Sequence, residues 1–225
     1  GGSASDGLAN DIINALFEDR DGSIWIATNG GLQRLRPGST SFESWQDVFP
    51  GNPYVGEIVY AVTRDSRGRY WIGTYRSGVT RFDPETGDLE TFRADPDDAG
   101  IANDLIYGIR EDRSGTVWIA TNGGLTRYSP ETDSFTSYRY DPENPDGLSS
   151  NTVRGILEDS RGRLWFATLG GGINRYLRES DTFSHITVDD GLASNRIVSL
   201  LEGHDGKIWA GTQHGLASFD PVSSR

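Results

Sequence analysis

One pattern of hydrophobic and polar positions recurs five times along the chain. Each copy has a short apolar segment, a polar turn that ends in Gly, and a nearly continuous apolar segment around a tryptophan. A strand with one solvated face alternates between apolar and polar residues, whereas a strand buried on both faces does not. We therefore predict that the tryptophan segment is a strand with both faces buried. The five tryptophans are Trp25, Trp71, Trp118, Trp165 and Trp209, spaced 46, 47, 47 and 44 residues apart.

Each unit divides into four strands, of which the tryptophan strand is the second. The first strand carries small residues such as Ala15 and Gly108, so we expect it to be innermost, where sheets crowd toward a common axis. The fourth is short and marked by aromatic residues such as Phe42, Trp45 and Phe135, and no helical periodicity is visible. The first strand is predicted over 12–17, 58–63, 105–110, 152–157 and 196–201, and the third over 32–35, 79–82, 125–128, 173–176 and 216–219.

A period in the mid-forties that is built from several short strands is typical of a β-propeller. The predicted fold is thus an all-β, five-bladed β-propeller of four-stranded antiparallel blades, in a single domain over residues 1–225. The last blade is incomplete, because no fourth strand follows Phe219 and none is visible in residues 1–10. Three interpretations remain: a three-stranded last blade, a larger propeller cut short, or unpaired edges that pair between chains. The approximate repeats are 6–52, 53–98, 99–145, 146–189 and 190–225.

Composition narrows the possible partners. The formal net charge of −12 and the pI near 4.6 argue against nucleic acid as a ligand, which needs a basic face, and against anionic membrane surfaces. The chain has no Cys, so it has no disulfide or thiolate metal site, and no apolar run long enough for membrane insertion. Residues 1–3 (Gly-Gly-Ser) and the absence of Met suggest an excised or engineered segment.

The repeat resembles that of the two-component regulator propeller family over essentially the whole chain. The matching text includes 147–153 (G-L-S-S-N-T-V), 191–197 (G-L-A-S-N-R-I), 111–121 (E-D-R-S-G-T-V-W-I-A-T) and 122–128 (N-G-G-L-T-R-Y). This resemblance implies a periplasmic or extracellular sensor region of bacterial hybrid two-component sensors, which often recognises carbohydrate breakdown products. In that family the propellers have seven or more blades and precede an immunoglobulin-like module, a membrane helix and a kinase.

Positions that differ between the repeats are the candidates for function, because structural demands are common to all copies. They lie on one face, where the loops between the second and third strands meet the start of the first strand. Aromatic, Asn, Arg and His side chains there suit a sugar or another small polar ligand. The alternative is structural: Asn-Gly pairs satisfy turns, and the tyrosines pack between blades. The candidate ligand-binding residues are Asn14, Tyr60, Tyr75, Arg76, Tyr107, Arg154 and His214; Val198 is the fifth residue at the strand position of Asn14.

Two other repeated sets favour structural roles. The acidic residues at the end of each first strand, interrupted by Arg64, would suit a cation, but they also lead into turns. The third-strand arginines (Arg34, Arg81, Arg127 and Arg175) indicate a repeated pairing with a carboxylate or carbonyl of the neighbouring blade.

No catalytic motif is present, and the three His lie on different units, so no metal and no cofactor is expected. The sequence therefore favours a non-enzymatic propeller that binds a small ligand or a partner. The first alternative is a structural propeller scaffold that self-associates into a homo-oligomer through its unpaired blade edges. A third, less favoured, is a propeller lyase or hydrolase, because such enzymes also use this fold.

Overall fold

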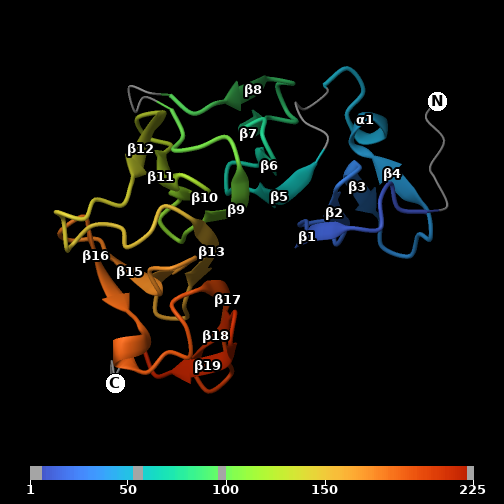
Figure 1. Ribbon diagram of the computed structural model, residues 1–225. Helices are drawn as coiled ribbons and strands as arrows, with labels where there is room; N and C mark the ends of the chain where they lie inside the picture. The colour runs from blue at the N-terminus through green and yellow to red at the C-terminus, as the bar shows by residue number, and fades with distance from the viewer. Residues whose placement is uncertain (1–6, 53–57, 96–99, 222–225) are drawn as a thin grey trace.

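The computed structural model describes residues 7–52, 58–95 and 100–221, which form five antiparallel sheets around a common axis (Figure 1). This confirms the predicted five-bladed β-propeller with a three-stranded last blade. Blade 1 comprises β1 (Ile13–Glu18), β2 (Ile24–Thr28), β3 (Gly31–Leu35) and β4 (Phe42–Ser44); blade 2 comprises β5 (Val59–Arg64), β6 (Tyr70–Thr74), β7 (Val79–Phe82) and β8 (Leu89–Phe92). Blade 3 comprises β9 (Ile106–Glu111), β10 (Val117–Thr121), β11 (Gly124–Ser129) and β12 (Ser134–Tyr138); blade 4 comprises β13 (Val153–Glu158), β14 (Leu164–Thr168), β15 (Ile173–Leu177) and β16 (Thr182–Ile186); blade 5 comprises β17 (Ile197–Glu202), β18 (Ile208–Thr212) and β19 (Gly215–Phe219).

The first strand of each blade is innermost, as the small residues predict. Within every sheet the strands follow chain order or its reverse, with the first strand at one edge, and β1, β5, β9 and β13 each contact the first strand of the next blade. Each of these strands begins one residue later than predicted. The residue before each strand lies outside the regular ladder but still accepts a hydrogen bond through its carbonyl. The carbonyl of Ile58, for example, accepts from the backbone amide of Tyr75, in the loop after β6.

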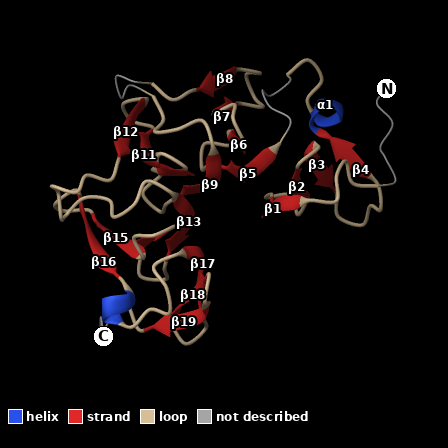
Figure 2. Cartoon of the chain, in the orientation of Figure 1, coloured by secondary structure: helices blue, strands red, loops and turns tan. Residues whose placement is uncertain are grey.

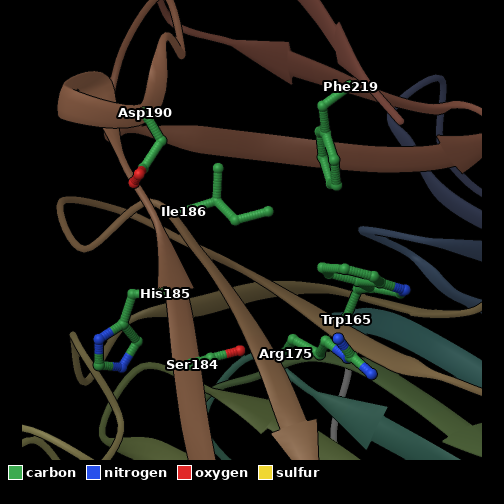
Figure 3. A pocket seen from close by; sticks show the side chains of 7 residues that line it. All are labelled: Trp165, Arg175, Ser184, His185, Ile186, Asp190 and Phe219. Carbon is green, nitrogen blue, oxygen red and sulfur yellow. The ribbon is translucent and has the colours of Figure 1, made fainter. Parts of the chain in front are cut away.

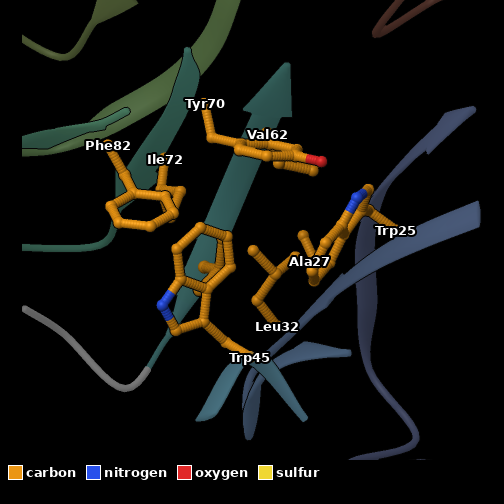
Figure 4. Packing of buried hydrophobic residues seen from close by; sticks show 9 residues of the cluster. Trp25, Ala27, Leu32, Trp45, Val62, Tyr70, Ile72 and Phe82 are labelled. Carbon is orange, nitrogen blue, oxygen red and sulfur yellow. The ribbon is translucent and has the colours of Figure 1, made fainter. Parts of the chain in front are cut away.

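The structure contains very little helix (Figure 2). The expectation that Trp45 lies in a fourth strand is wrong: it begins the short helix α1 (Trp45–Val48), and a 3-10 turn, η1, covers Val188–Asp190. The local reason is a capping box, in which the Ser44 hydroxyl accepts from the Asp47 amide while the Asp47 carboxylate accepts from the Ser44 amide. Trp45 then packs between Trp25 and Phe82, at ring centroid distances of 5.4 and 5.2 Å (Figure 4).

A buried carboxylate holds each tryptophan of the first four blades in place. The Asp that opens the turn after the first strand accepts a hydrogen bond from the indole Nε1 six residues later, at 2.7 Å for Trp118 and Asp112 and 3.0 Å for Trp165 and Asp159. Blade 5 has Gly203 at this position, so Trp209 has no such acceptor. These aspartates thus hold the tryptophan side chains in addition to opening the turns.

The tryptophan of each blade packs against the following blade, so its burial depends on a neighbour. Trp25, Trp71 and Trp118 are fully buried and Trp165 is 2 % exposed, whereas Trp209 is 37 % exposed. The prediction that both faces of every tryptophan strand are buried is therefore wrong for blade 5. No sixth blade covers it among the described residues, and in Figure 1 the blades form an open arc rather than a closed ring.

The first blade is uncovered on its opposite face. Ile13 is 47 % exposed, although its counterparts Val59, Ile106, Val153 and Ile197 are completely buried. Leu16 on blade 1 and Leu201 on blade 5 are each 66 % exposed. We call the four places where one blade packs on the next the internal joints. The uncovered faces of blade 1 and blade 5 thus present apolar side chains like those that pack together at the internal joints.

Candidate functional site

The second residue of every first strand sits at a β-bulge. In blade 2, for example, Val59 pairs with Thr74 and Ala61 with Gly73, so Tyr60 has no partner of its own. A bulge re-aims a side chain and ends regular pairing, and bulges are frequent beside functional sites. The residues at the bulges are Asn14, Tyr60, Tyr107, Arg154 and Val198.

The structure brings five of the seven candidates together in one row across blades 2, 3 and 4. Tyr60 contacts Tyr75 at 5.8 Å and Tyr107 at 6.1 Å between ring centroids. A guanidinium lies over the outer ring at each end: Arg76 is 4.9 Å from the centroid of Tyr75, and Arg154 is 4.1 Å from that of Tyr107. We call Arg76, Tyr75, Tyr60, Tyr107 and Arg154 the aromatic row.

Several polar groups of the aromatic row are available to a ligand. The Tyr107 hydroxyl donates to Asn122 Oδ1 at 3.2 Å, whereas the Tyr60 and Tyr75 hydroxyls have no hydrogen-bond partner among the described residues. Neither guanidinium of the row forms an ion pair or hydrogen bond within that part of the chain. All three tyrosines and Arg154 are half-buried, and Arg76 is exposed. In a protein of net charge −12, the row is a local site of positive charge and free donors.

The other two candidates lie apart from the row. Asn14 donates to the Asn29 side chain at 2.9 Å and to the Val59 carbonyl at 2.8 Å, so it ties blade 1 to blade 2. His214 is exposed in the turn between β18 and β19, where its backbone amide donates to Thr212. No hydrogen bond or ring contact joins either side chain to a side chain of the aromatic row within the described residues. Asn14 therefore makes contacts that hold two blades together, and His214 has no such contact among the described side chains.

Further along the same inner strands, blades 1 to 4 enclose a central cavity of about 430 Å³. Apolar side chains such as Leu16, Val62 and Ile156 line it together with Arg64 and Glu111. Both charge signs are present at this end of the axis. The cavity is therefore not lined by a ring of carboxylates alone.

Three of the carboxylates considered for a cation site, those of Glu111, Glu158 and Glu202, accept hydrogen bonds from the preceding blade. Glu111 accepts from the Ser66 amide at 2.7 Å and its hydroxyl at 2.6 Å, and Glu202 makes the same two contacts with Ser160. No cluster of three or more His, Cys, Asp or Glu suited to a metal ion occurs among the described residues. These contacts agree with the structural interpretation of the acidic positions.

The predicted pairing of the third-strand arginines across blades is confirmed for two of the four. Arg81 pairs with Asp133 of the next blade at 2.7 Å, and Arg127 with Asp181 at 3.3 Å. Arg34 pairs within its own blade, with Glu43. Arg175 forms no ion pair within the described part of the chain.

The five repeats match one family model, described as two component regulator propeller, at residues 7–30, 53–76, 100–123, 147–170 and 191–214. The chain belongs to the two component regulator propeller family. Each matched segment runs from the loop before a first strand to the loop after the tryptophan strand, and so includes the bulge of every blade. No curated protein matches this two component regulator propeller chain in sequence.

Among solved structures, the chain is similar to the extracellular domain of the putative hybrid two component system BT3049 from B. thetaiotaomicron, with a TM-score of 0.79 and 22 % identity over 98 % of this chain and 30 % of that one. It is also similar to the extracellular domain of the putative one component system BT4673 from the same organism, with a TM-score of 0.66 and 26 % identity. That match covers 97 % of this chain and 31 % of the other. The two component regulator propeller chain thus spans about a third of the length of these structures.

The fold also occurs in an enzyme. Virginiamycin B lyase from Staphylococcus aureus matches with a TM-score of 0.61 and 19 % identity over 92 % of this chain and 69 % of that one, a likeness that shows the fold alone. Neither helical segment in the described parts of this two component regulator propeller chain has the length or hydropathy of a membrane span.

Proposed function

We propose that this chain is a non-enzymatic sensory propeller that binds a small polar ligand of the carbohydrate class at the aromatic row. The observation that supports this most is the continuous series of ring and cation–π contacts from Arg76 to Arg154, which joins three blades and leaves hydroxyl and guanidinium donors without partners among the described residues. Aromatic faces cover the apolar faces of sugar rings, and the flanking donors orient ring substituents. The similarity to extracellular domains of two component systems supports a periplasmic or extracellular setting.

Charge narrows the proposed ligand further. The row has a guanidinium at each end and no carboxylate among its contacts, so it complements a sugar that carries carboxylates better than a neutral one. We expect acidic oligosaccharides, such as those that contain uronic acids, to bind more tightly than neutral ones of the same length. This preference should weaken as the salt concentration rises, because the row is only half-buried.

The test is calorimetric titration of the protein with a panel of acidic and neutral oligosaccharides. Tyr107→Ala and Arg154→Ala should each weaken binding about tenfold or more, because one removes an aromatic ring of the row and the other removes a guanidinium donor. The matched controls are Tyr140→Ala and Arg161→Ala, exposed residues outside the row that should leave binding unchanged. A panel in which nothing binds, or variants that bind like the wild type, would contradict the proposal.

The uncovered end faces support a second candidate function, a scaffold that self-associates. Ile13 on blade 1 and Trp209 on blade 5 occupy positions that are buried at the internal joints, and Leu16 and Leu201 add exposed apolar side chains to the same two blades. Blade 5 of one copy therefore complements blade 1 of another. Such head-to-tail contacts are heterologous and generate open chains unless the rotation closes.

Sedimentation velocity over a range of concentrations tests this candidate. The wild type should show a mass that increases with concentration, and Leu16→Glu or Leu201→Glu should each weaken association about tenfold or more by burying a charge. A mixture of the two variants should form a heterodimer, because each retains the face that the other has lost. Tyr140→Glu serves as an exposed control. A wild type that is monomeric at every concentration rules this candidate out.

A further inference from the structure

The outer edge of blade 5 differs from the outer edges of the other blades. In blades 1 to 4 the third strand pairs with a fourth, as β11 does with β12 and β15 with β16. The third strand of blade 5, β19, pairs only with β18 among the described residues. Its other edge has no backbone partner in the described part of the chain, and an unpaired strand edge is the usual template for addition of an extended segment.

A pocket of about 160 Å³ lies beside this edge, between blades 4 and 5 (Figure 3). Trp165, Ile186 and Phe219 form its apolar walls, and Arg175, Ser184 and Asp190 lie around them. Trp165 and Phe219 are in edge contact, with 5.4 Å between ring centroids. The pocket is large enough for one aromatic side chain.

The equivalent space at the preceding joints is filled by an aromatic residue of the fourth strand. In blade 3, Phe135 stands opposite Tyr128 in the ladder and packs on it at 5.2 Å and on Phe92 at 4.8 Å. In blade 4, Phe183 stands opposite Tyr176 and packs on it at 5.5 Å. Phe219 corresponds to these tyrosines, but no aromatic residue of a fourth strand stands opposite it in the described chain.

A charged group at the pocket also lacks its counterpart. At the earlier joints the third-strand arginine pairs with an Asp two positions before the fourth-strand aromatic: Arg81 with Asp133, and Arg127 with Asp181. Arg175 is at the same position in blade 4. Its guanidinium lies over Trp165 and its buried Nε has no hydrogen bond among the described residues.

We propose that the free edge of β19, the pocket and Arg175 form one binding site for an extended segment of a partner protein in which an acidic residue stands two positions before an aromatic one. The segment adds to blade 5 as its fourth strand. Its backbone pairs with β19, its aromatic side chain enters the pocket, and its carboxylate pairs with Arg175. A folded second copy does not offer a free segment of this kind, because Phe92, Phe135 and Phe183 are paired in β8, β12 and β16 of their own blades, and Trp45 and Phe49 pack within blade 1 and on blade 2.

The probe is a labelled peptide with the sequence of residues 131–138, Glu-Thr-Asp-Ser-Phe-Thr-Ser-Tyr, titrated with the whole protein and followed by fluorescence anisotropy. We expect saturable binding and slower amide hydrogen exchange in 215–219. A peptide with Phe135→Ala should bind about tenfold more weakly or worse. A peptide with Asp133→Asn should bind about three- to fivefold more weakly, because the ion pair lies partly in solvent.

Variants of the protein locate the site. Ser184→Tyr places a ring in the pocket from an exposed position and should abolish binding, whereas Arg175→Gln should weaken the parent peptide but leave the Asp133→Asn peptide unaffected. Arg161→Gln, an exposed residue outside the pocket, is the matched control. The proposal is overturned if the peptide does not bind, if Phe135→Ala binds equally well, if exchange in 215–219 is unchanged, or if Ser184→Tyr and Arg175→Gln bind like the wild type.

Discussion

Replacing Trp118 with alanine is expected to lower the free energy of unfolding by about 3–5 kcal/mol, the usual range for a fully buried aromatic residue. Trp118 is completely buried and packs against Phe166 and Tyr176 of blade 4, at 5.1 and 4.9 Å between ring centroids. Its loss also leaves Asp112 without the indole donor, so the buried carboxylate loses a hydrogen bond. Urea unfolding followed by far-UV circular dichroism measures the effect.

The repeat provides a matched control for this prediction. Trp209 has the same position in blade 5, but it is 37 % exposed and has no aspartate partner. Trp209→Ala should therefore cost only about 1 kcal/mol, as is usual for single substitutions away from a packed core. Equal losses for the two variants would mean that burial by the following blade is not what gives each tryptophan its role.

Asp159→Ala should also lower the free energy of unfolding by about 3–5 kcal/mol, because it removes one partner of a buried ion pair. The carboxylate of Asp159 is completely buried and accepts from Trp165 Nε1 at 3.0 Å, from Arg163 Nε at 2.6 Å and from the Arg163 amide at 2.9 Å. Asp159→Asn keeps one acceptor oxygen and should lose less. Thermal and urea unfolding of both variants measure the difference.

The pH dependence of the free energy of unfolding provides a second measurement of the role of Asp159. Burial alone raises the pKa of Asp159, but hydrogen bonds from Trp165 and from the backbone and guanidinium of Arg163 outweigh it and lower the pKa. The carboxylate of Asp159 therefore binds a proton less tightly in the folded protein than in the unfolded chain, where an Asp has a pKa of about 3.9. The stabilisation is present above pH 4 or so and is lost as the pH falls through the folded pKa. Asp159→Ala should therefore lose less stability than the wild type on acidification.

The control for Asp159 is Asp205→Ala in the corresponding turn of blade 5. Asp205 is exposed, and its carboxylate accepts one backbone hydrogen bond, from Lys207 at 3.2 Å. Its replacement should change the free energy of unfolding by about 0.5 kcal/mol or less. If the two substitutions cost the same, the network around Trp165 and Arg163 does not supply the expected stability.

The candidate site was only partly predictable from the sequence. Differences between the repeats singled out the positions of Tyr60, Tyr107 and Arg154, and the structure brings their side chains together because they have a common place in the first strand. The bulge at that place was missed, although it left a signal. Apolar residues recur three apart in the first strand, as in Val59 and Val62, whereas residues on one face of a regular strand are two apart.

By itself the sequence determined what each repeat encodes locally: the number of blades, the order and approximate bounds of their strands, the innermost position of the first strand, and the turns that open with Asp. These follow from periodicity and turn chemistry within about 45 residues. The tertiary structure alone decided which side chains meet across blades. The contacts of the aromatic row, the exposure of Trp209 and the lack of an ion pair for Arg175 among the described residues depend on whether a neighbouring blade supplies a ring, a cover or a carboxylate. No single repeat carries that information.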